Sequence, residues 1–273
     1  MSETKHDTLR FGIVTDIHYN PETETGNQTE AGLERCIEKW TSEGVEFVIQ
    51  LGDLISREGP EAEADLIAVR DMLARFSGKV YHVAGNHCLA VPPERYKAIM
   101  GLDSLYYTFS SHGTRFIVLD GMDVSIVNEP QNKADRHLLE YYRDVVKAPF
   151  YCGAIGTRQL DWLVKELDLA LKNEEPVIIF NHLPLLGETT DEKHGLLWNH
   201  EEVVAILSRY PNVHACLSGH YHSAAQAMRN GTHFAVLPAF RDCFEELNGC
   251  CFMGEFSGKK LFEFVISMID DKL

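Results

Sequence analysis

Residues 9–18, LRFGIVTDIH, join an apolar strand-like run to polar side chains at its end, and this pattern decides the fold. The pattern returns in 45–53, VEFVIQLGD, and in 80–87, VYHVAGNH. Between these segments, residues 29–43 and 61–76 carry apolar side chains at helical spacing. The order strand, helix, strand, helix, strand predicts parallel strands that are joined by right-handed crossovers.

The rest of the chain continues this alternation after an irregular stretch. We expect a hairpin of 106–109 and 115–119, a helix over 157–171, a strand at 176–180, a helix at 201–210, a strand at 213–217, and three short antiparallel strands from 233 onward. The helix over 157–171 is expected to turn five residues inward, namely Leu160, Leu163, Val164, Leu167 and Leu171. Residues 121–156 lack a period and are expected to form a cap-like excursion. Without a repeat or a linker, residues 1–273 are predicted to form one α/β domain.

Composition limits the functions open to this chain. It has 273 residues, of which 45% are hydrophobic and 24% charged, as in ordinary globular proteins. The net charge of −16 predicts no nucleic-acid partner and no anionic-lipid partner. No apolar run approaches the length of a membrane span, and the N-terminal stretch lacks an apolar signal core. We therefore predict a cytoplasmic location, and the seven cysteines, which lack a CxxC spacing, are expected to be reduced. The oligomeric state stays open.

Five of the expected strands end in side chains that bind metals or transfer protons. These residues are Asp16, His18, Asp53, Asn86, His87, His182, His220 and His222. Ligands of open α/β sheets bind beyond the carboxyl ends of the strands, so these side chains are expected to converge. Imidazole, carboxylate and carboxamide groups suit Mn, Fe or Zn. Each fragment alone occurs often by chance, but the five together favour a two-metal centre with a bridging carboxylate.

Local geometry gives a reason for the spacing within these fragments. In Asp16-x-His18 and His220-x-His222, alternate residues point the same way if the backbone is extended, so both could hold one ion. Gly219 would then leave room for close backbone approach.

The order D-x-H, GD, GNH, H, GHxH resembles the calcineurin-like metallophosphoesterase superfamily. This resemblance implies a four-layer α/β/β/α sandwich of two mixed sheets. It also implies one metal held by Asp16, His18, Asp53 and His222, and a second held by the bridging Asp53 with Asn86, His182 and His220. His87 would lie close to the substrate phosphate as a catalytic residue that binds no metal.

Longer segments are similar to the manganese-dependent ADP-ribose/CDP-alcohol diphosphatase group. These are FIVLDGMDVS (116–125), YCGAIGTRQLDWLVKEL (151–167) and NHLPLLGETTDEKHGLLWNHEEVVAIL (181–207). The resemblance implies a small phosphorylated nucleotide-type substrate and two divalent ions, Mn first, with Fe and Zn suiting the same ligands. It further implies that a hydroxide bridging the two metals attacks a diphosphate bond.

Three other functions remain open at this point. The same centre suits a cyclic-nucleotide or general phosphodiesterase. A protein serine/threonine phosphatase would need an open groove for its partner, and the excursion of 121–156 favours a covered pocket instead. A scaffold on this fold typically loses ligands, whereas all eight metal-binding and catalytic positions are present here.

Residues that would hold the rest of the substrate are harder to identify. Trp198 is expected either to stack on a base of the substrate or to pack in the core. Cys88 is expected to be an inert small residue, part of the pocket wall, or an oxidation-sensitive thiol. For Tyr141, Tyr142, Phe150 and Tyr151, packing of the excursion onto the domain is favoured over stacking on a base. Trp198 and Cys88 are thus the predicted substrate-binding residues.

Overall fold

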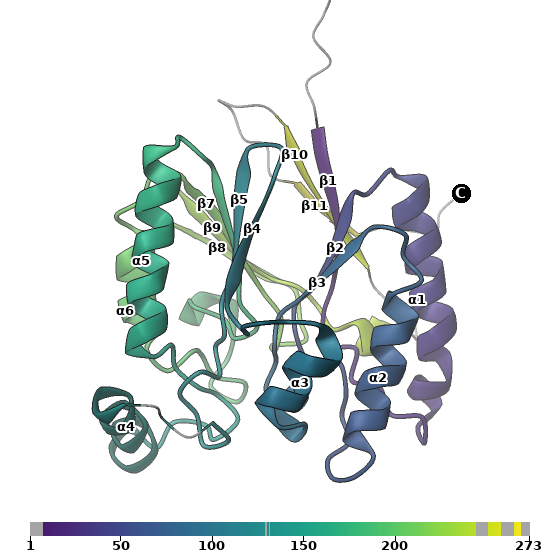
Figure 1. Ribbon diagram of the computed structural model, residues 1–273, viewed down its shortest axis with the longest axis horizontal. Coiled ribbons are helices and arrows are strands. Elements are labelled where there is room, and N and C mark those ends of the chain that lie inside the picture. Colours follow the sequence, from purple (N-terminus) through teal and green to yellow (C-terminus); the bar gives the residue numbers. More distant parts are fainter. Residues whose placement is uncertain (1–7, 129, 131, 244–250, 258–264, 269–273) are drawn as a thin grey trace, which may run out of the picture.

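The computed structural model describes residues 8–128, 130, 132–243, 251–257 and 265–268. Two sheets face each other, and helices cover the outer side of each (Figure 1). The strand order is β11-β10-β1-β2-β3 in the five-stranded sheet and β4-β5-β6-β7-β9-β8 in the six-stranded sheet. These layers confirm the predicted α/β/β/α sandwich of two mixed sheets.

The five-stranded sheet contains the strand of the segment 9–18 and the two strands that follow it in the chain. Its strands are β1 (Thr8–Val14), β2 (Phe47–Gln50), β3 (Lys79–His82), β10 (Phe252–Ser257) and β11 (Val265–Met268), and its helices are α1 (Glu24–Ser42), α2 (Ala62–Leu73) and α3 (Pro93–Met100). The strands β1, β2 and β3 are parallel, which confirms the expected alternation. The strand β10 lies antiparallel to β1, and β11 lies antiparallel to β10.

The second sheet has antiparallel strands only at its edges. Its strands are β4 (Tyr107–Ser111), β5 (Thr114–Val118), β6 (Val177–Phe180), β7 (Val213–Ser218), β8 (Ala225–Arg229) and β9 (Thr232–Val236), and its helices are α5 (Thr157–Lys172) and α6 (His200–Leu207). The hairpin of β4 and β5 is confirmed. Of the three antiparallel strands expected from 233 onward, β10 and β11 pair as expected. The first, β9, is antiparallel to the unexpected strand β8 but pairs in parallel with β7.

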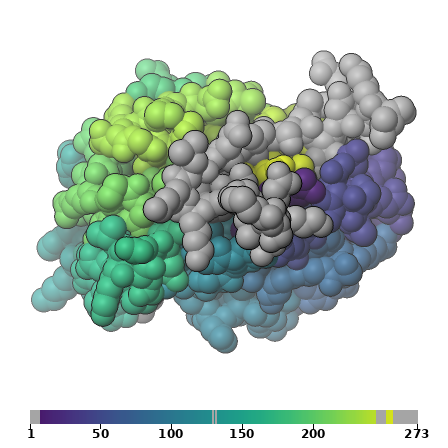
Figure 2. Space-filling model, turned by 90° about the horizontal axis from the view of Figure 1, so that it is seen from above, coloured from purple at the N-terminus to yellow at the C-terminus, as the bar shows by residue number. Residues whose placement is uncertain are grey.

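Aromatic side chains fill the space between the sheets. The ring of Phe11 stacks on that of Phe47 at 5.2 Å, and Phe116 stacks on Phe180 at 5.9 Å. All four side chains are buried, and Phe11 contacts Phe116 edge-on across the two sheets. Seen from above, the purple-to-blue and green parts of the chain lie on opposite sides (Figure 2). This packed interface fixes the strand ends of one sheet relative to those of the other.

Two helices deviate from the expected pattern. The helix α1 begins at Glu24, before the expected start at residue 29, because Thr23 caps it by accepting a hydrogen bond from the Gly26 N–H at 3.0 Å. In α5, Leu163 and Leu167 are buried as expected, but Leu171 is 43% exposed. The buried Ala170 precedes Leu171, and successive helical residues are rotated by about 100°, so Leu171 turns away from the sheet.

The excursion of 121–156 has structure of its own. It contains α4 (Lys133–Glu140) and a π-helical turn at Tyr141–Val146. A β-bridge between Val124 and Ala154 joins its two ends. The excursion therefore leaves and re-enters the domain at one place, beside the carboxyl end of β5.

Two observations bear on the predicted location of the protein. In the part of the chain that the structure describes, no helix is both long and apolar enough to cross a membrane. Among the residues that the structure describes, five cysteines are free, but Cys243 is disulfide-bonded, so the expectation of reduced cysteines is wrong at that position. Spacing along the chain did not indicate this bond, because the fold decides which thiols meet. The cytoplasmic location stays a prediction.

Candidate metal centre

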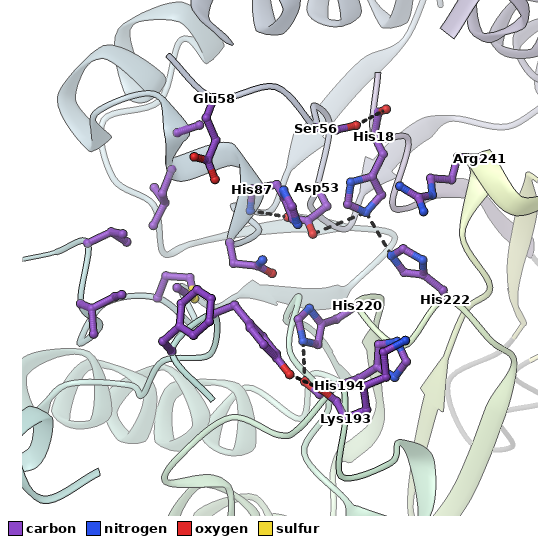
Figure 3. Close-up of a pocket in the computed structure, with 18 of the residues that line it drawn as sticks. His18, Asp53, Ser56, Glu58, His87, Lys193, His194, His220, His222 and Arg241 are labelled. Atoms are coloured by element: carbon purple, nitrogen blue, oxygen red, sulfur yellow. Dashed lines mark hydrogen bonds and ion pairs between the residues drawn. The ribbon is translucent and has the colours of Figure 1, made fainter. Parts of the chain in front are cut away.

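The candidate ligands converge at the carboxyl ends of five strands, as the sequence predicts. The residues after β1 are Asp16 and His18, after β2 Asp53, after β3 Asn86 and His87, after β6 His182, and after β7 His220 and His222. Figure 3 labels His18, Asp53, His87, His220 and His222 around one pocket. Asn86 also lines this pocket. Both sheets therefore contribute to one site.

The first group of ligands is Asp16, His18 and His222. The Asp16 Oδ1 atom lies 3.6 Å from His18 Nε2 and 3.4 Å from His222 Nε2. The two imidazole nitrogens lie 3.0 Å apart. Three donor atoms thus surround one small space, in which a single cation can contact all of them.

The second group of ligands is Asp53, His182 and His220. The Asp53 Oδ2 atom lies 3.2 Å from His182 Nε2, which in turn lies 3.2 Å from Asn86 Oδ1. The carboxamide oxygen therefore lies beside this group, so the four residues that the resemblance implied for the second metal lie together.

Asp53 connects the two groups. Its Oδ2 atom is also 3.7 Å from His18 Nε2, which belongs to the first group. Its Oδ1 atom accepts a hydrogen bond from the His87 N–H at 2.9 Å, so the carboxylate has a fixed orientation. One carboxylate that faces an imidazole of each group is what a pair of bridged metal ions requires.

The backbone at the ligands is left-handed, not extended as the sequence argument assumed. The φ angles are 52° at Asp16, 48° at His18, 51° at Asp53, 70° at His220 and 64° at His222. Asp16 and His18 still reach the same point, because the chain turns sharply after the strand. His220 and His222 belong to different groups, so the expectation that these two hold one ion is wrong. Conformations of this kind cost free energy in a residue other than glycine and concentrate at functional sites.

Glycine makes room for two of these turns. A Cβ atom at Gly219 would overlap the Thr15 hydroxyl and the Asp16 carboxylate, and one at Gly52 would overlap the His182 ring. Gly52 also has a φ of 114°, which side-chain-bearing residues rarely adopt. The expected close approach of backbone to ligand at Gly219 is therefore present.

Three imidazoles, those of His182, His220 and His222, are each oriented by a hydrogen bond from one ring nitrogen, whereas the buried Nδ1 of His18 has no partner among the described residues. The Nδ1 of His182 donates to the Leu51 carbonyl at 2.8 Å, and the Nδ1 of His222 donates to Asp242 Oδ2 at 3.0 Å. The Nε2 of His220 donates to the His194 carbonyl at 2.8 Å. These bonds leave Nε2 of His182 and His222, and Nδ1 of His220, to face the cluster. Such outer partners fix the ring and its tautomer for metal binding.

Burial and neighbouring charges shift the pKa values of this cluster in opposite directions. Burial raises the pKa of Asp16, but attraction to the nearby imidazoles of His18 and His222 outweighs it and holds the pKa well below its usual value. Burial likewise opposes protonation of His182 and His222, yet neighbouring carboxylates, Asp53 for the first and Asp16 with Asp242 for the second, raise the pKa of each to about 9. Without metal ions, the carboxylates are therefore balanced by protons on these two rings.

The donor set fits a pair of divalent cations. The Asp16 Oδ1 atom is buried and accepts no hydrogen bond, although two imidazole nitrogens face it. An anionic oxygen without a donor in a buried position is costly unless a cation occupies the space beside it. Nitrogen and oxygen ligands without thiolates suit Mn, Fe and Zn.

A cavity of about 820 Å³ opens over this centre. One side of it is apolar and belongs to the excursion, with Ile126, Val127, Phe150 and Tyr151 among the lining residues. Phe150 is 68% exposed. The other side carries His87 and Arg241. The cavity is therefore large enough for a nucleotide-sized ligand.

The two residues predicted to bind substrate lie elsewhere. Trp198 is buried in the core under α5 and α6, donates to the Pro149 carbonyl at 3.2 Å, and stacks on Tyr142. Cys88 is fully buried, its sulfur accepts from the Leu54 N–H, and burial raises its pKa to about 12. Neither lines the cavity. Both side chains are buried in the protein and hydrogen-bonded there, which argues against contact with substrate. Burial with a raised pKa also makes Cys88 an unreactive thiol.

Phe150 and Tyr151, for which packing was the favoured interpretation, line the cavity instead. Sequence reasoning also missed Arg241 and Asp242, which form part of a short 3-10 helix at Phe240–Cys243. No spacing or neighbouring motif marked these two residues as part of a site.

The comparisons with known proteins agree with this geometry. Residues 9–224 match the family model of the calcineurin-like phosphoesterases. A manganese-dependent ADP-ribose/CDP-alcohol diphosphatase of Arabidopsis thaliana is 30% identical over 279 residues, covering 89% of each chain. A 3′,5′-cyclic-nucleotide phosphodiesterase of Nostoc is 24% identical over 195 residues, covering 71% of this chain and 62% of the relative.

A solved structure supports the fold independently. The dimetal phosphatase from Danio rerio superposes with a TM-score of 0.78, covering 95% of this chain and 98% of its own at 22% identity. A family model that spans most of the chain, a relative that matches nearly its whole length and a shared fold show that this protein belongs to the calcineurin-like phosphoesterase family.

Proposed function

We propose that the protein is a two-metal phosphohydrolase that cleaves the diphosphate bond of nucleoside diphosphate-linked compounds such as ADP-ribose or CDP-alcohols. The observation that carries this proposal is the position of Asp53 Oδ2, 3.7 Å from His18 and 3.2 Å from His182. The diphosphatase named above supports the choice of substrate and of manganese.

The ligand sets follow from the two groups of side chains. Asp16, His18, Asp53 and His222 would hold one ion, and Asp53, Asn86, His182 and His220 would hold the other. Two such ions, when bound, activate water as a nucleophile and neutralise charge that develops on phosphoryl oxygens.

His87 is the residue proposed to act on the substrate directly. It lines the cavity, its ring lies 4.8 Å from that of His18, and its backbone N–H is fixed by Asp53. Its side chain would donate a hydrogen bond to the departing oxygen or to the phosphoryl group. For a diphosphate the leaving group is a weak base, so this donation needs to be only partial.

The organic part of the substrate would lie against the apolar wall. Phe150 and Tyr151 present aromatic surface to the cavity, and Tyr151 is fixed by the hydrogen bond from its hydroxyl to the Lys193 carbonyl. Aromatic side chains in such positions stack on nucleobases without strong sequence preference. Ile126 and Val127 extend this wall.

A substrate panel tests the proposal. The purified protein is stripped of metal, reloaded with Mn²⁺, Zn²⁺ or Fe²⁺, and assayed with ADP-ribose, CDP-choline, 2′,3′-cyclic AMP and 3′,5′-cyclic AMP. We expect Mn²⁺ to support hydrolysis of ADP-ribose and CDP-choline well above that of the cyclic nucleotides. Preference for a cyclic nucleotide would replace the proposal with the phosphodiesterase alternative, which the Nostoc relative represents.

A further inference from the structure

The short 3-10 helix at Phe240–Cys243 is attached to two of the ligand turns through its backbone. The Ala239 N–H donates to the His222 carbonyl at 3.2 Å, and the Phe240 N–H donates to the Thr15 carbonyl at 2.9 Å. The Arg241 N–H donates to the Asp16 carbonyl at 3.4 Å. Although this segment follows the family-matching region 9–224, it is therefore fixed against the first group of ligands.

Side chains extend this attachment into the cavity. Asp242 accepts from His222 Nδ1 through Oδ2 and from Arg241 Nε through Oδ1, each at 3.0 Å. Because this bond uses Nε of Arg241, it leaves the two terminal nitrogens of the guanidinium for other partners. The side chain is 41% exposed, and it lies beside His18 and His222 at the wall of the cavity (Figure 3).

A diphosphate substrate needs a cation at this place. The two ligand groups can neutralise the phosphate that is attacked, but a diphosphate carries a second anionic phosphate a few ångströms away. Among the described lining residues, Arg241 and Lys193 are the Lys and Arg side chains, in a chain with a net charge of −16. Arg241 is the one held by a carboxylate beside the ligands, and a guanidinium binds phosphate oxygens through paired hydrogen bonds.

We propose that Arg241 binds the phosphate group that is not attacked, and that it thereby selects diphosphates over diesters with a single phosphate. This inference rests on the proposed function and names the residue that sets its substrate class. Asp242 is a positioning residue for both His222 and Arg241.

Activity on two substrates tests the inference. Arg241→Gln and Arg241→Lys are compared with the unmodified protein on ADP-ribose and on bis(4-nitrophenyl) phosphate, which has one phosphate. We expect Arg241→Gln to lower kcat/KM for ADP-ribose by about 10- to 100-fold, mainly through KM, and to change the diester value less than about threefold. Arg241→Lys should restore part of the loss. Arg143→Gln is the matched control, because Arg143 pairs with the neighbouring Asp144 on the exposed π-helical turn.

Binding and metal content separate this inference from the proposed function. Calorimetry of ADP and AMP on the Mn²⁺-loaded protein should show tighter binding of ADP, and Arg241→Gln should bring the two affinities within about threefold of each other. This ratio tests Arg241 even if the unmodified protein leaves ADP-ribose intact, a result that would reject the proposed function alone. An unchanged ADP-to-AMP ratio, equal losses on both substrates, or loss of bound metal in Arg241→Gln would each overturn the role of Arg241.

Discussion

Replacing Asp53 with asparagine should weaken both metal sites at once. The substitution keeps the size of the side chain and an oxygen that can accept from the His87 N–H, but it removes the negative charge. Asp53 is 1% exposed, and its Oδ2 atom lies 3.7 Å from His18 Nε2 and 3.2 Å from His182 Nε2. A pair of unit charges about 4 Å apart interacts by about 4 kcal/mol at an effective dielectric constant of 20. Because an amide oxygen retains part of this attraction, we expect a loss of about 2.8 kcal/mol, or about 100-fold in affinity, at each site.

The assay is a count of bound ions. Purified Asp53→Asn is dialysed against limiting Mn²⁺, its metal content is measured by elemental analysis, and its affinity by calorimetric titration. Asp120→Asn is the matched control, since Asp120 is also a buried aspartate just after a strand but belongs to no ligand group among the described residues. His182→Gln should weaken only one ion. If Asp53→Asn still binds two ions, or loses only one, Asp53 does not bridge.

Three further predictions concern catalysis, metal removal and pH. His87→Ala should slow hydrolysis of alkyl phosphodiesters about 100-fold but that of diphosphates less than about tenfold, in steady-state assays; equal slowing would remove the role at the leaving oxygen. With free Mn²⁺ at 100 times the Kd of each of two sites, removal of the metals by a chelator should lower the free energy of unfolding by about 5 kcal/mol. Calorimetry should then record a Tm that is lower by about 10–20 °C; an unchanged Tm would contradict metal binding in the folded state. Burial and the nearby Asp123 raise the pKa of Asp120 to about 7. Since this folded-state pKa exceeds the unfolded value of about 3.9, the stability that Asp120 contributes is present below about pH 4 and declines as the pH rises to about 7. Denaturant titrations should therefore show Asp120→Asn gaining about 1–3 kcal/mol over the unmodified protein at pH 8 and less at pH 5; an equal gain at both pH values would contradict the raised pKa.

The alternation of strands and helices was predictable because the apolar run of each strand stops at polar side chains, whereas the four layers were implied by the family resemblance and not by this pattern. In 9–18, the apolar run stops at Thr15 and polar side chains follow at once. In an α/β protein such a boundary marks the carboxyl edge of a sheet, where binding residues gather. The same rule located Asp53 and His182, although 129 positions separate them in the chain. Their contact at 3.2 Å needed the aromatic interface between the sheets, which no local pattern reveals.

The residues that line the cavity outside the candidate metal ligands were harder to predict from the sequence than the ligands themselves. Trp198 and Phe150 are both aromatic residues in irregular segments, yet the first is 6% exposed and the second 68% exposed. A loop has no period that could tell the inner from the outer face, so only tertiary packing distinguishes these two residues. Arg241 and Asp242 were missed for a related reason, because their role comes from backbone bonds to the turns after β1 and β7.

The left-handed turns explain why the ligand positions stood out in the sequence even though the assumed geometry was wrong. A chain selected only for folding would favour glycine, asparagine or aspartate at a φ near 50°, since other residues pay about 1 kcal/mol or more there. Histidine occupies such positions at His18, His220 and His222, and replacing one of them with glycine would relieve the strain but remove a candidate ligand. Retaining the strained residue makes physical sense only if its side chain does something that glycine cannot. The polar fragments at the strand ends were therefore informative because they are locally unfavourable, and the aromatic core between the sheets supplies the stability that holds them in place.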